Sequence, residues 1–338
     1  MKTKSKTQKQ QPTRVTPRAG TKRSAAVPAR APRSIPFRLK RILVTTDFSD
    51  ESKTALPYAA AFAQRFGGEI ALLNVVESPS HFTGLESVIL LQTGDAAMGR
   101  VYKGLDKLAG QAFPSKTPVT THARTGKPLH EITNAARELE ADLIIMATHG
   151  YSGLKHALIG STTERVVQLA PCPVLAVRDT ARGTSGKQPE SVAIRRILLT
   201  TDFSGNSLKA FPLAQSLAEG FGARLTLMHV VERFPIDALL GKEVTRETST
   251  QLVEQAQTRL TELAAGLRKR DGFEADLVVR FGKPFDEITR LAKELDASLI
   301  VVATHGYTGL KHLFIGSVAE RVLRHARCPV LIVRETKQ

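Results

Sequence analysis

Two short motifs contain residue types whose spacing favours binding of an anion. Residues 45–47 read Thr-Thr-Asp and residues 148–150 read Thr-His-Gly. After Gly150 come nine residues and then Gly160 and Ser161, and a helical pattern follows them. Glycine lets the backbone approach an anion closely, and the free N–H groups at the start of a helix attract negative charge. The spacing therefore predicts a phosphate site near the carboxylate of Asp47.

Both motifs occur a second time, at a distance close to half the chain. Residues 200–202 and 304–306 repeat Thr-Thr-Asp and Thr-His-Gly, and Gly316-Ser317 repeats the glycine and the serine. Residues 147–178 and 303–334 are identical at 22 of 32 positions, whereas residues 80–111 and their counterparts have diverged almost completely. A repeat of this length is about the size of a domain. The chain is therefore a tandem duplication, and each copy is expected to fold as its own domain.

Each copy alternates short apolar runs with longer amphipathic stretches, which is typical of a parallel α/β sheet. The expected strands are residues 42–46, 70–76, 119–123, 143–147 and 174–177, and in the second copy residues 197–201, 225–231, 275–280, 299–303 and 330–333. Helical spacing is found at residues 51–66, about 97–112, 129–139 and 162–169. The predicted fold class is α/β, with two doubly wound five-stranded parallel sheets in tandem and strand order 3-2-1-4-5 in each.

This strand order predicts where a ligand would bind. In doubly wound sheets, ligands lie beyond the carboxyl ends of the strands, at the point where the strand order reverses. Here that point falls between the first and fourth strands, and the two repeated motifs follow those strands. The sequence therefore predicts one crevice in each copy, with both motifs at its edge.

Helix capping is a competing explanation for part of this pattern. Residues 161–164 and 317–320 match capping boxes, in which the serine caps the helix and the glutamate reaches back to it. Capping explains the serine and the glutamate, but it requires no pair of glycines at a fixed distance before them. Phosphate binding accounts for the glycines as well.

The net charge of +16 is concentrated at the start of the chain. Residues 1–35 contain ten Lys or Arg and no Asp or Glu, with few large apolar side chains. Such a segment cannot offset its ordering entropy by burial, so a disordered basic tail is expected. The tail can serve as a solubilising arm or bind nucleic acid weakly through counterion release. An organellar transit peptide has a similar composition and is the minority interpretation.

The repeat and the local composition predict the domain boundaries. Residues 38–178 and 194–334 form the two expected domains, and residues 179–193, rich in Gly, Ser and Thr, form a linker between them. Cys172 and Cys328 occupy the same position in each copy, as expected of small buried side chains in a reducing compartment. Because no apolar run reaches the length of a membrane span and the first residues contain no apolar signal core, a soluble cytoplasmic protein is expected.

The repeated segments resemble the universal stress protein family. The resemblance rests on ILVTTDFS and ILLTTDFS at the first strand, LLNVVE and LMHVVE at the second, TGKP and FGKP before the third helix, and the block from THGY to CPVL in both copies. It covers nearly everything except residues 1–38 and the linker. In the nucleotide-binding branch the last motif starts with a glycine, where this chain has Ala147 and Ala303. The second glycine, the nine-residue spacing and the Gly-Ser pair match.

The resemblance implies an ATP-binding regulatory protein of the stress response. Asp47 and Asp202 would contact the ribose or adenine side, and the backbones of Val75 and Val230 would bind adenine. The phosphates, accompanied by Mg²⁺, would lie against Gly150, Gly160, Ser161 and Thr162 in the first copy and Gly306, Gly316, Ser317 and Val318 in the second. Thr45, Ala147, Thr200 and Ala303 complete the predicted lining.

Two other functions stay open at this point. A nucleotide-independent stress protein that acts through protein contacts is favoured by Ala147 and Ala303, whose methyl groups would crowd a ribose or phosphate. A slow nucleotide hydrolase would need catalytic groups at the crevice, where His149 and His305 are the candidates. At most a weak ATPase activity is expected, and the protein partners are unknown.

Two further patterns bear on ligands and on assembly. Residues 94–101 resemble a Walker loop, but Arg100 and Val101 replace its lysine and its serine or threonine. The histidines lack metal-ligand spacing, so no metal site of the protein's own is expected. The final strands, 174–177 and 330–333, are apolar edges, which predicts that the two copies pair through them as a pseudo-dimer within one chain. A homodimer of the chain stays open.

Overall fold

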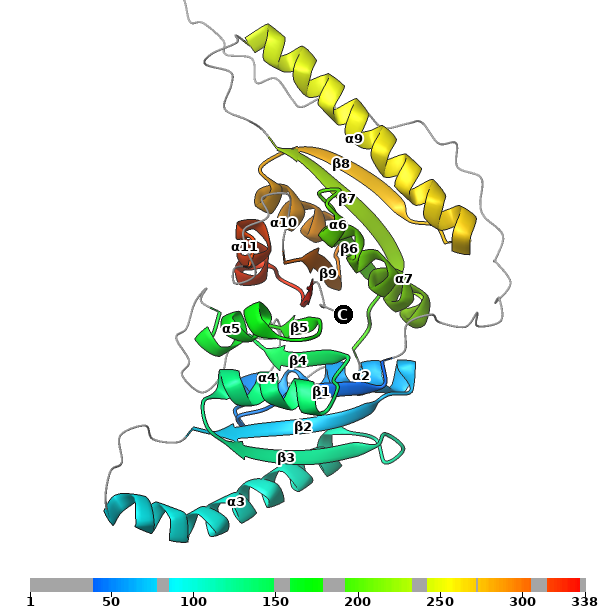
Figure 1. Cartoon of the computed structure of the whole chain (residues 1–338). Helices are drawn as coiled ribbons and strands as arrows, with labels where there is room; N and C mark the ends of the chain where they lie inside the picture. The colour runs from blue at the N-terminus through cyan, green and yellow to red at the C-terminus, as the bar shows by residue number, and fades with distance from the viewer. Residues whose placement is uncertain are drawn as a thin grey trace, which may run out of the picture. The chain divides into compact units, whose positions relative to one another are not determined.

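The computed structural model describes residues 39–77, 85–148, 159–178, 192–232, 242–271, 273–304 and 315–334 (Figure 1). The predicted basic tail and most of the predicted linker lie outside the described residues.

Each copy consists of strands that alternate with helices. The first copy contains β1 (Arg41–Thr45), α1 (Asp50–Lys53), α2 (Leu56–Phe66), β2 (Glu69–Val76), α3 (Leu85–Ala112), β3 (Val119–Thr125), α4 (Pro128–Glu138), β4 (Leu143–Ala147), α5 (Ser161–Leu169) and β5 (Val174–Val177). The second contains β6 (Arg196–Thr200), α6 (Gly205–Leu208), α7 (Ala210–Phe221), β7 (Arg224–Glu232), α9 (Lys242–Asp271), β8 (Asp276–Gly282), α10 (Pro284–Glu294), β9 (Leu299–Ala303), α11 (Ser317–His325) and β10 (Val330–Val333). The two series match in order, as expected of a duplication.

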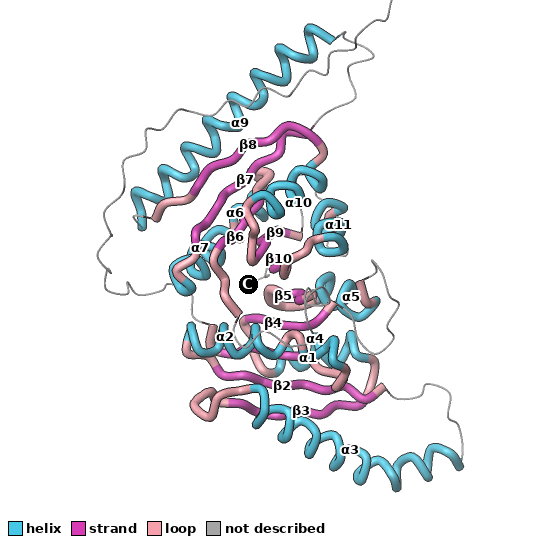
Figure 2. The backbone as a smooth tube through the Cα atoms, turned by 180° about the vertical axis from the view of Figure 1, so that it is seen from behind, coloured by secondary structure: helices cyan, strands magenta, loops and turns pink. Residues whose placement is uncertain are grey.

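The ten strands form one sheet, in the order β3-β2-β1-β4-β5-β10-β9-β6-β7-β8 (Figure 2). Within each half the neighbouring strands are parallel and have the predicted order 3-2-1-4-5. The halves join where β5 and β10 pair antiparallel, with Leu175 opposite Leu331. Both final strands are therefore covered by each other, and the predicted pairing of the two copies within one chain is confirmed.

Buried apolar side chains form one cluster on each face of the sheet. Successive residues of a strand point to opposite faces, so Val44 of β1 shares a cluster with Phe62 of α2, whereas Leu43 shares the other with Ile132 of α4. Helices α2, α3 and α7 contribute to the first cluster, and α4, α5, α10 and α11 contribute to the second. This two-sided burial explains the continuous apolar runs of the strands.

Helices α2 and α7 pack together across the seam between the copies. The ring centroid of Phe221 lies 5.0 Å from that of Phe62 and 5.6 Å from that of Phe66, both edge-on. Such aromatic pairs contribute about 0.5–1.5 kcal/mol beyond their buried area. Aromatic packing therefore reinforces the strand pairing.

Two equivalent arginines make equivalent bonds across the seam. Arg178 donates to the carbonyl of Arg324, and Arg334 donates to the carbonyl of Gln168. In each case a residue that follows the last strand of one copy reaches the last helix of the other. The seam thus has the pseudo-twofold symmetry expected of two related domains.

Two helices differ from the sequence prediction. Residues 51–66, predicted as one helix, are split into α1 and α2, because Pro57 in the first turn of α2 has no N–H to continue a helix from α1. Helix α3 begins at Leu85 rather than near residue 97. The Walker-like residues 94–101 therefore lie inside a helix, which cannot form a loop that surrounds phosphates.

Candidate functional site

The turn after β1 is held by its own side chains. The hydroxyl of Thr46 accepts a hydrogen bond from the N–H of Phe48 at 3.0 Å, and the carboxylate of Asp47 accepts one from the N–H of Ser49 at 3.0 Å. Ser49, rather than Asp47, caps α1, because its side chain accepts from the N–H of Ser52. Capping of α1 therefore does not explain the aspartate.

The turn after β6 repeats this geometry. The φ angles of Phe48 and Phe203 are 65° and 63°, a left-handed conformation that costs a bulky residue of the order of 1–3 kcal/mol. Asp202 accepts from the N–H of Ser204 at 3.0 Å. Partial burial raises the pKa of Asp202, but hydrogen bonds from Ser204 and Ser207 outweigh it and keep the pKa below its ordinary value. The carboxylate is therefore ionised at neutral pH.

The helices that follow β4 and β9 start without a side-chain cap. Gly160 is the N-cap of α5 and Gly316 is the N-cap of α11, and no side chain caps either helix. The capping-box explanation is therefore wrong, and the two glutamates instead bind Arg324: Glu164 at 2.9 Å and Glu320 at 3.0 Å. Helix N–H groups without a cap carry partial positive charge and suit an anion.

Gly160 and Gly316 hold these helix starts against the ends of β4 and β9. The N–H of Gly160 donates to the carbonyl of Thr148 at 2.7 Å, and that of Gly316 donates to the carbonyl of Thr304 at 2.6 Å. A Cβ atom added at the glycines would lie 3.2 Å and 3.0 Å from the same oxygens. Backbone packing therefore favours glycine at both positions independently of any ligand.

The fold brings most of the predicted site residues to one edge of the sheet. Because β1 and β4 are neighbours, and so are β6 and β9, the residues at their carboxyl ends lie together in each copy. This group comprises Thr45, Asp47 and Ala147, with Gly160, Ser161 and Thr162 of α5, and in the second copy Thr200, Asp202 and Ala303, with Gly316, Ser317 and Val318. Val75 and Val230 lie near the ends of the adjacent strands. Gly150, Gly306, His149 and His305 lie outside the described residues.

A polar residue that the sequence analysis did not single out supports each turn. Asn74 is buried and donates from its side-chain amide to the carbonyl of Thr46 at 2.8 Å. His229, at the same position in β7, bonds through Nδ1 to the carbonyl of Thr201 at 2.8 Å. Burial lowers the pKa of His229, although this bond and Asp202 act in the opposite direction. The sequence signal that could have identified Asn74 and His229 is a polar residue inside the otherwise apolar runs LLNVVE and LMHVVE.

The two turns differ in what packs on their phenylalanine rings. The ring of Phe203 contacts His229, with 4.3 Å between the ring centroids, and the guanidinium of Arg259, 4.4 Å from the Phe203 centroid. In the first copy the helix residue beside the Phe48 ring is Gly104, where an added Cβ would lie 3.2 Å from the ring. The backbone of the turn is therefore repeated, but its surroundings are not.

Comparison with known proteins identifies the family. The model of the universal stress protein family matches residues 38–178 and again residues 193–334. The chain belongs to this family. Universal stress protein MJ0531 of Methanocaldococcus jannaschii is 34% identical over 144 residues, which cover 43% of this chain and 84% of that protein. Universal stress protein E of Escherichia coli K12 is 24% identical over 307 residues, covering 87% of this chain and 94% of that protein.

Solved structures of the family share the fold over both domains. The crystal structure of a universal stress protein from Archaeoglobus fulgidus matches with a TM-score of 0.62 and 21% identity, and the match covers 88% of this chain and 99% of that one. At this identity the likeness concerns the fold alone. Two universal stress protein domains in tandem are thus shown, and the ligand must be argued from the crevice.

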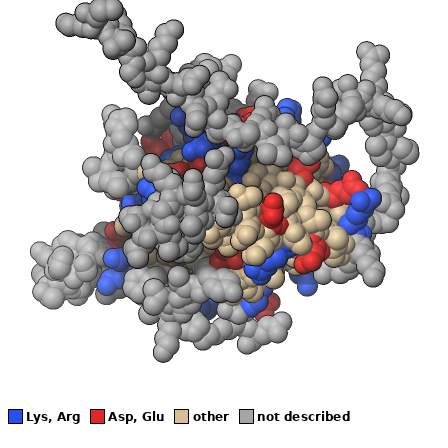
Figure 3. All heavy atoms as spheres, turned by 90° about the horizontal axis from the view of Figure 1, so that it is seen from above, with Lys and Arg blue, Asp and Glu red and all other residues tan. Residues whose placement is uncertain are grey.

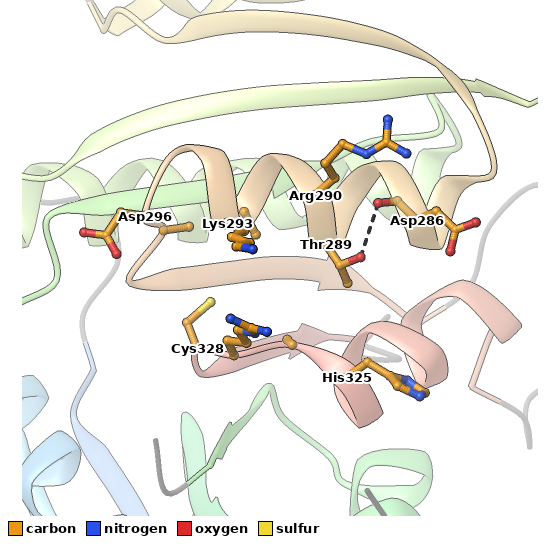
Figure 4. Close-up of a pocket in the computed structure, with 11 residues that line it drawn as sticks. Asp286, Thr289, Arg290, Lys293, Asp296, His325 and Cys328 are labelled. Atoms are coloured by element: carbon orange, nitrogen blue, oxygen red, sulfur yellow. Dashed lines mark hydrogen bonds between the residues drawn. The ribbon is translucent and has the colours of Figure 1, made fainter. Parts of the chain in front are cut away.

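The second domain also has a hollow of about 650 Å³ between α10 and the end of α11 (Figure 4). Several of its charged residues already have partners, since Arg290 pairs with Glu287 at 2.9 Å and Asp296 with Arg196 at 3.8 Å. Burial raises the pKa of Cys328 to about 12, so this thiol stays protonated. Asp296 and Cys328 precede β9 and β10, so this part of the hollow lies at the opposite edge of the sheet from the crevice.

The described ranges contain neither a cluster of metal-binding side chains nor a helix suited to span a membrane. No group of three or more His, Cys, Asp or Glu in the described part of the chain could hold a metal ion. None of the described helices is both long and apolar enough to cross a membrane. On the face shown in Figure 3, basic and acidic side chains of the described residues are interspersed. That face therefore shows no area of a single charge among the described residues.

Proposed function

We propose that each domain binds ATP in the crevice at the carboxyl ends of its strands, and that occupancy alters the contacts of this stress protein with other proteins. The observation that carries the proposal is the combination of an acidic turn and an uncapped helix start at the same edge of the sheet. Asp47 and α5 provide these in the first domain, and Asp202 and α11 provide them in the second.

The adenosine end is assigned to the ends of β1 and β2 and of β6 and β7. Val75 and Val230 pack against the apolar cluster on the face of the sheet where α5 and α11 lie. A base beside these valines and phosphates at the helix starts would share one crevice. The carboxylates of Asp47 and Asp202 would accept hydrogen bonds from ribose hydroxyls, a contact of the charge-assisted kind.

The phosphates are assigned to the helix starts. Ser161 and Thr162 offer backbone N–H groups and two hydroxyls, whereas Ser317 and Val318 offer N–H groups and one hydroxyl. Mg²⁺ would reach the protein through the phosphates, because this ion keeps several waters and needs few protein ligands. Hydrolysis is expected to be slow, since amides that hold phosphates do not activate a water molecule.

A nucleotide-independent stress protein is the second candidate, and Ala147 and Ala303 favour it. Each alanine ends a strand at the crevice, where the nucleotide-binding branch of the family has glycine. Ala147 is 9% exposed, and its carbonyl accepts from the hydroxyl of Thr163 at 2.9 Å. Compared with glycine, each alanine adds one methyl group to the lining of the proposed crevice.

Native mass spectrometry of the freshly purified chain tests the proposal. ATP binding predicts a retained mass of one or two adenine nucleotides per chain, or their uptake when ATP and Mg²⁺ are added. If the wild-type chain takes up none and the double variant Ala147→Gly with Ala303→Gly does, the second candidate is correct. Failure of both proteins to bind would also reject ATP as the ligand.

A further inference from the structure

A small hollow lies between the starts of α4 and α5 in the first domain. Its volume is about 200 Å³, and Lys127, His130, Ser161, Thr162 and Arg165 are among the residues that line it. Pockets for drug-sized ligands have roughly 300–1,000 Å³. This hollow therefore suits a small group, or one end of a larger ligand.

The charged side chains that line the hollow have the same sign. Lys127 and Arg165 are basic residues, and none of the described residues that line the hollow is Asp or Glu. Neither side chain makes an ion pair with a carboxylate of the described residues, unlike Arg290 and Asp296 of the larger hollow. Ammonium, guanidinium and hydroxyl groups together are the donors that proteins use for phosphate.

Lys127 follows a turn in which glycine is favoured at position 126. Gly126 has φ of 153°, and a Cβ there would lie 2.9 Å from Oε1 of Glu131. Lys127 is then the N-cap of α4, with Pro128 as the first helical residue. The turn thus places the lysine at the start of α4, beside the start of α5.

The second domain has different chemistry at the same positions. Asp286 replaces His130, and Val318 replaces Thr162, so one carboxylate is gained and one hydroxyl is lost. Arg321, the counterpart of Arg165, lies over the ring of Phe285, 4.4 Å from its centroid. Arg321 therefore already packs on an aromatic ring. In the first domain Leu129 stands at the position of Phe285, so Arg165 has no such ring at that position. The second domain is therefore less suited to an added phosphate.

We propose that the hollow of the first domain binds the terminal phosphoryl group of a polyphosphate ligand, with Lys127 and Arg165 as its contacts. The inference rests on the proposed function, because Ser161 and Thr162 belong both to the hollow and to the phosphate end of the crevice. It adds that the first domain distinguishes ligands by the number of phosphates. The second domain lacks this discrimination.

Calorimetric titrations of the full nucleotide-free chain with ATP, AMP and inorganic tripolyphosphate test this inference. Lys127→Ala and Arg165→Ala should each weaken ATP at one site about 10-fold or more, as expected when a hydrogen bond to a charged group is lost. AMP affinity should not change, because its single phosphate, next to the ribose, would lie short of Lys127 and Arg165. Lys283→Ala, at the equivalent exposed position of the second domain, is the matched control and should leave ATP affinity unchanged.

The outcomes separate this inference from the proposed function. Equal effects of Lys127→Ala on ATP and AMP, or no effect on either, would overturn the inference and leave the proposed function standing. If tripolyphosphate binds the wild-type chain through Lys127 but neither nucleotide binds, the hollow is a polyphosphate site and ATP is not the ligand. Absence of binding by all three compounds would overturn both.

Discussion

At the carboxyl ends of their strands, the first and second domains have the same turns but different neighbouring side chains. Next to the turn after its first strand, the first domain has Asn74 and Gly104, and the second has His229 and Arg259. At the start of α4 the first domain has His130, whereas at the equivalent position of α10 the second domain has Asp286. The backbone N–H bond to the aspartate and the uncapped helix start occur in both.

This contrast separates the features that the two domains share at the predicted site from the features in which they differ. The repeated features are backbone geometry: two phenylalanines with positive φ and two glycines against a strand end. The divergent features are side chains that touch these shared features from neighbouring helices and strands. A duplicated domain can therefore keep the place where a ligand binds while the ligand that each copy prefers changes.

The largest expected effect comes from filling the space at a helix start in one domain only. Gly160→Val would bring a side chain against the carbonyl of Thr148, and Gly316→Val would do so at Thr304. Each change should abolish ATP binding in its own domain and cost about 1–3 kcal/mol of stability by overpacking. Titration with ATP and thermal unfolding of both variants check this. Loss of both sites in either variant would show that the domains are coupled.

The aspartates should have a smaller effect on binding. Asp47→Ala and Asp202→Ala should each weaken ATP at one site by about 1–3 kcal/mol, the range for a hydrogen bond to a charged group. Asp202 is partly buried and Asp47 is exposed, so the change at Asp202 should lower the melting temperature more. Calorimetry measures both quantities. Unchanged ATP affinity in both variants would remove the aspartates from the site.

Stability should depend on pH through the second domain. Burial lowers the pKa of folded His229 below the value of about 6.5 for an unfolded chain. The unfolded state then binds more protons, so stability is complete above about pH 7 and decreases as the pH falls. His229→Asn, which copies Asn74, should reduce this decrease. Burial and Arg124 also lower the pKa of His122, so part of the dependence should remain.

Denaturant unfolding of the wild-type chain and the His229→Asn variant at about pH 7.5 and pH 5 provides the measurement. The difference in unfolding free energy between the two pH values should be smaller for the variant. An equal difference in both proteins would show that His229 does not contribute to it.

The smallest effect concerns the cation on the Phe203 ring. Arg259→Gln removes the charge with little change in helix propensity, and it should destabilise the chain by about 0.5–1 kcal/mol, as for an exposed cation–π contact. Arg268→Gln on the same helix is the control, because the ion pair of Arg268 with Glu274 is exposed and contributes little. Equal effects of the two changes in denaturant unfolding would show that the stack is not stabilising.

The sequence predicted the parts of the molecule that depend on local periodicity and on the repeat. Apolar runs located the strands, and their alternation with helices predicted a doubly wound sheet of the observed order. The apolar final strands predicted the pairing of β5 with β10. The split of residues 51–66 was missed because helical spacing continues through Pro57, whereas the missing N–H interrupts the helix.

Contacts between distant residues were not predictable. Glu164 matched a capping box, yet its partner Arg324 is 160 positions away and on the other domain. The stack of Arg259, Phe203 and His229 joins a helix, a turn and a strand, and no local pattern relates them. Such pairings depend on the packing of complete elements, which a pattern within one element does not contain.

The central claim is that the two crevices bind ATP and differ in how they hold its phosphates. Calorimetric titration of the nucleotide-free wild-type chain with ATP in the presence of Mg²⁺ tests this most directly. We predict two sites of unequal affinity, with the tighter one lost in Gly160→Val and the weaker one lost in Gly316→Val. Absence of binding, or two sites of equal affinity that Gly160→Val and Gly316→Val affect alike, would contradict the account.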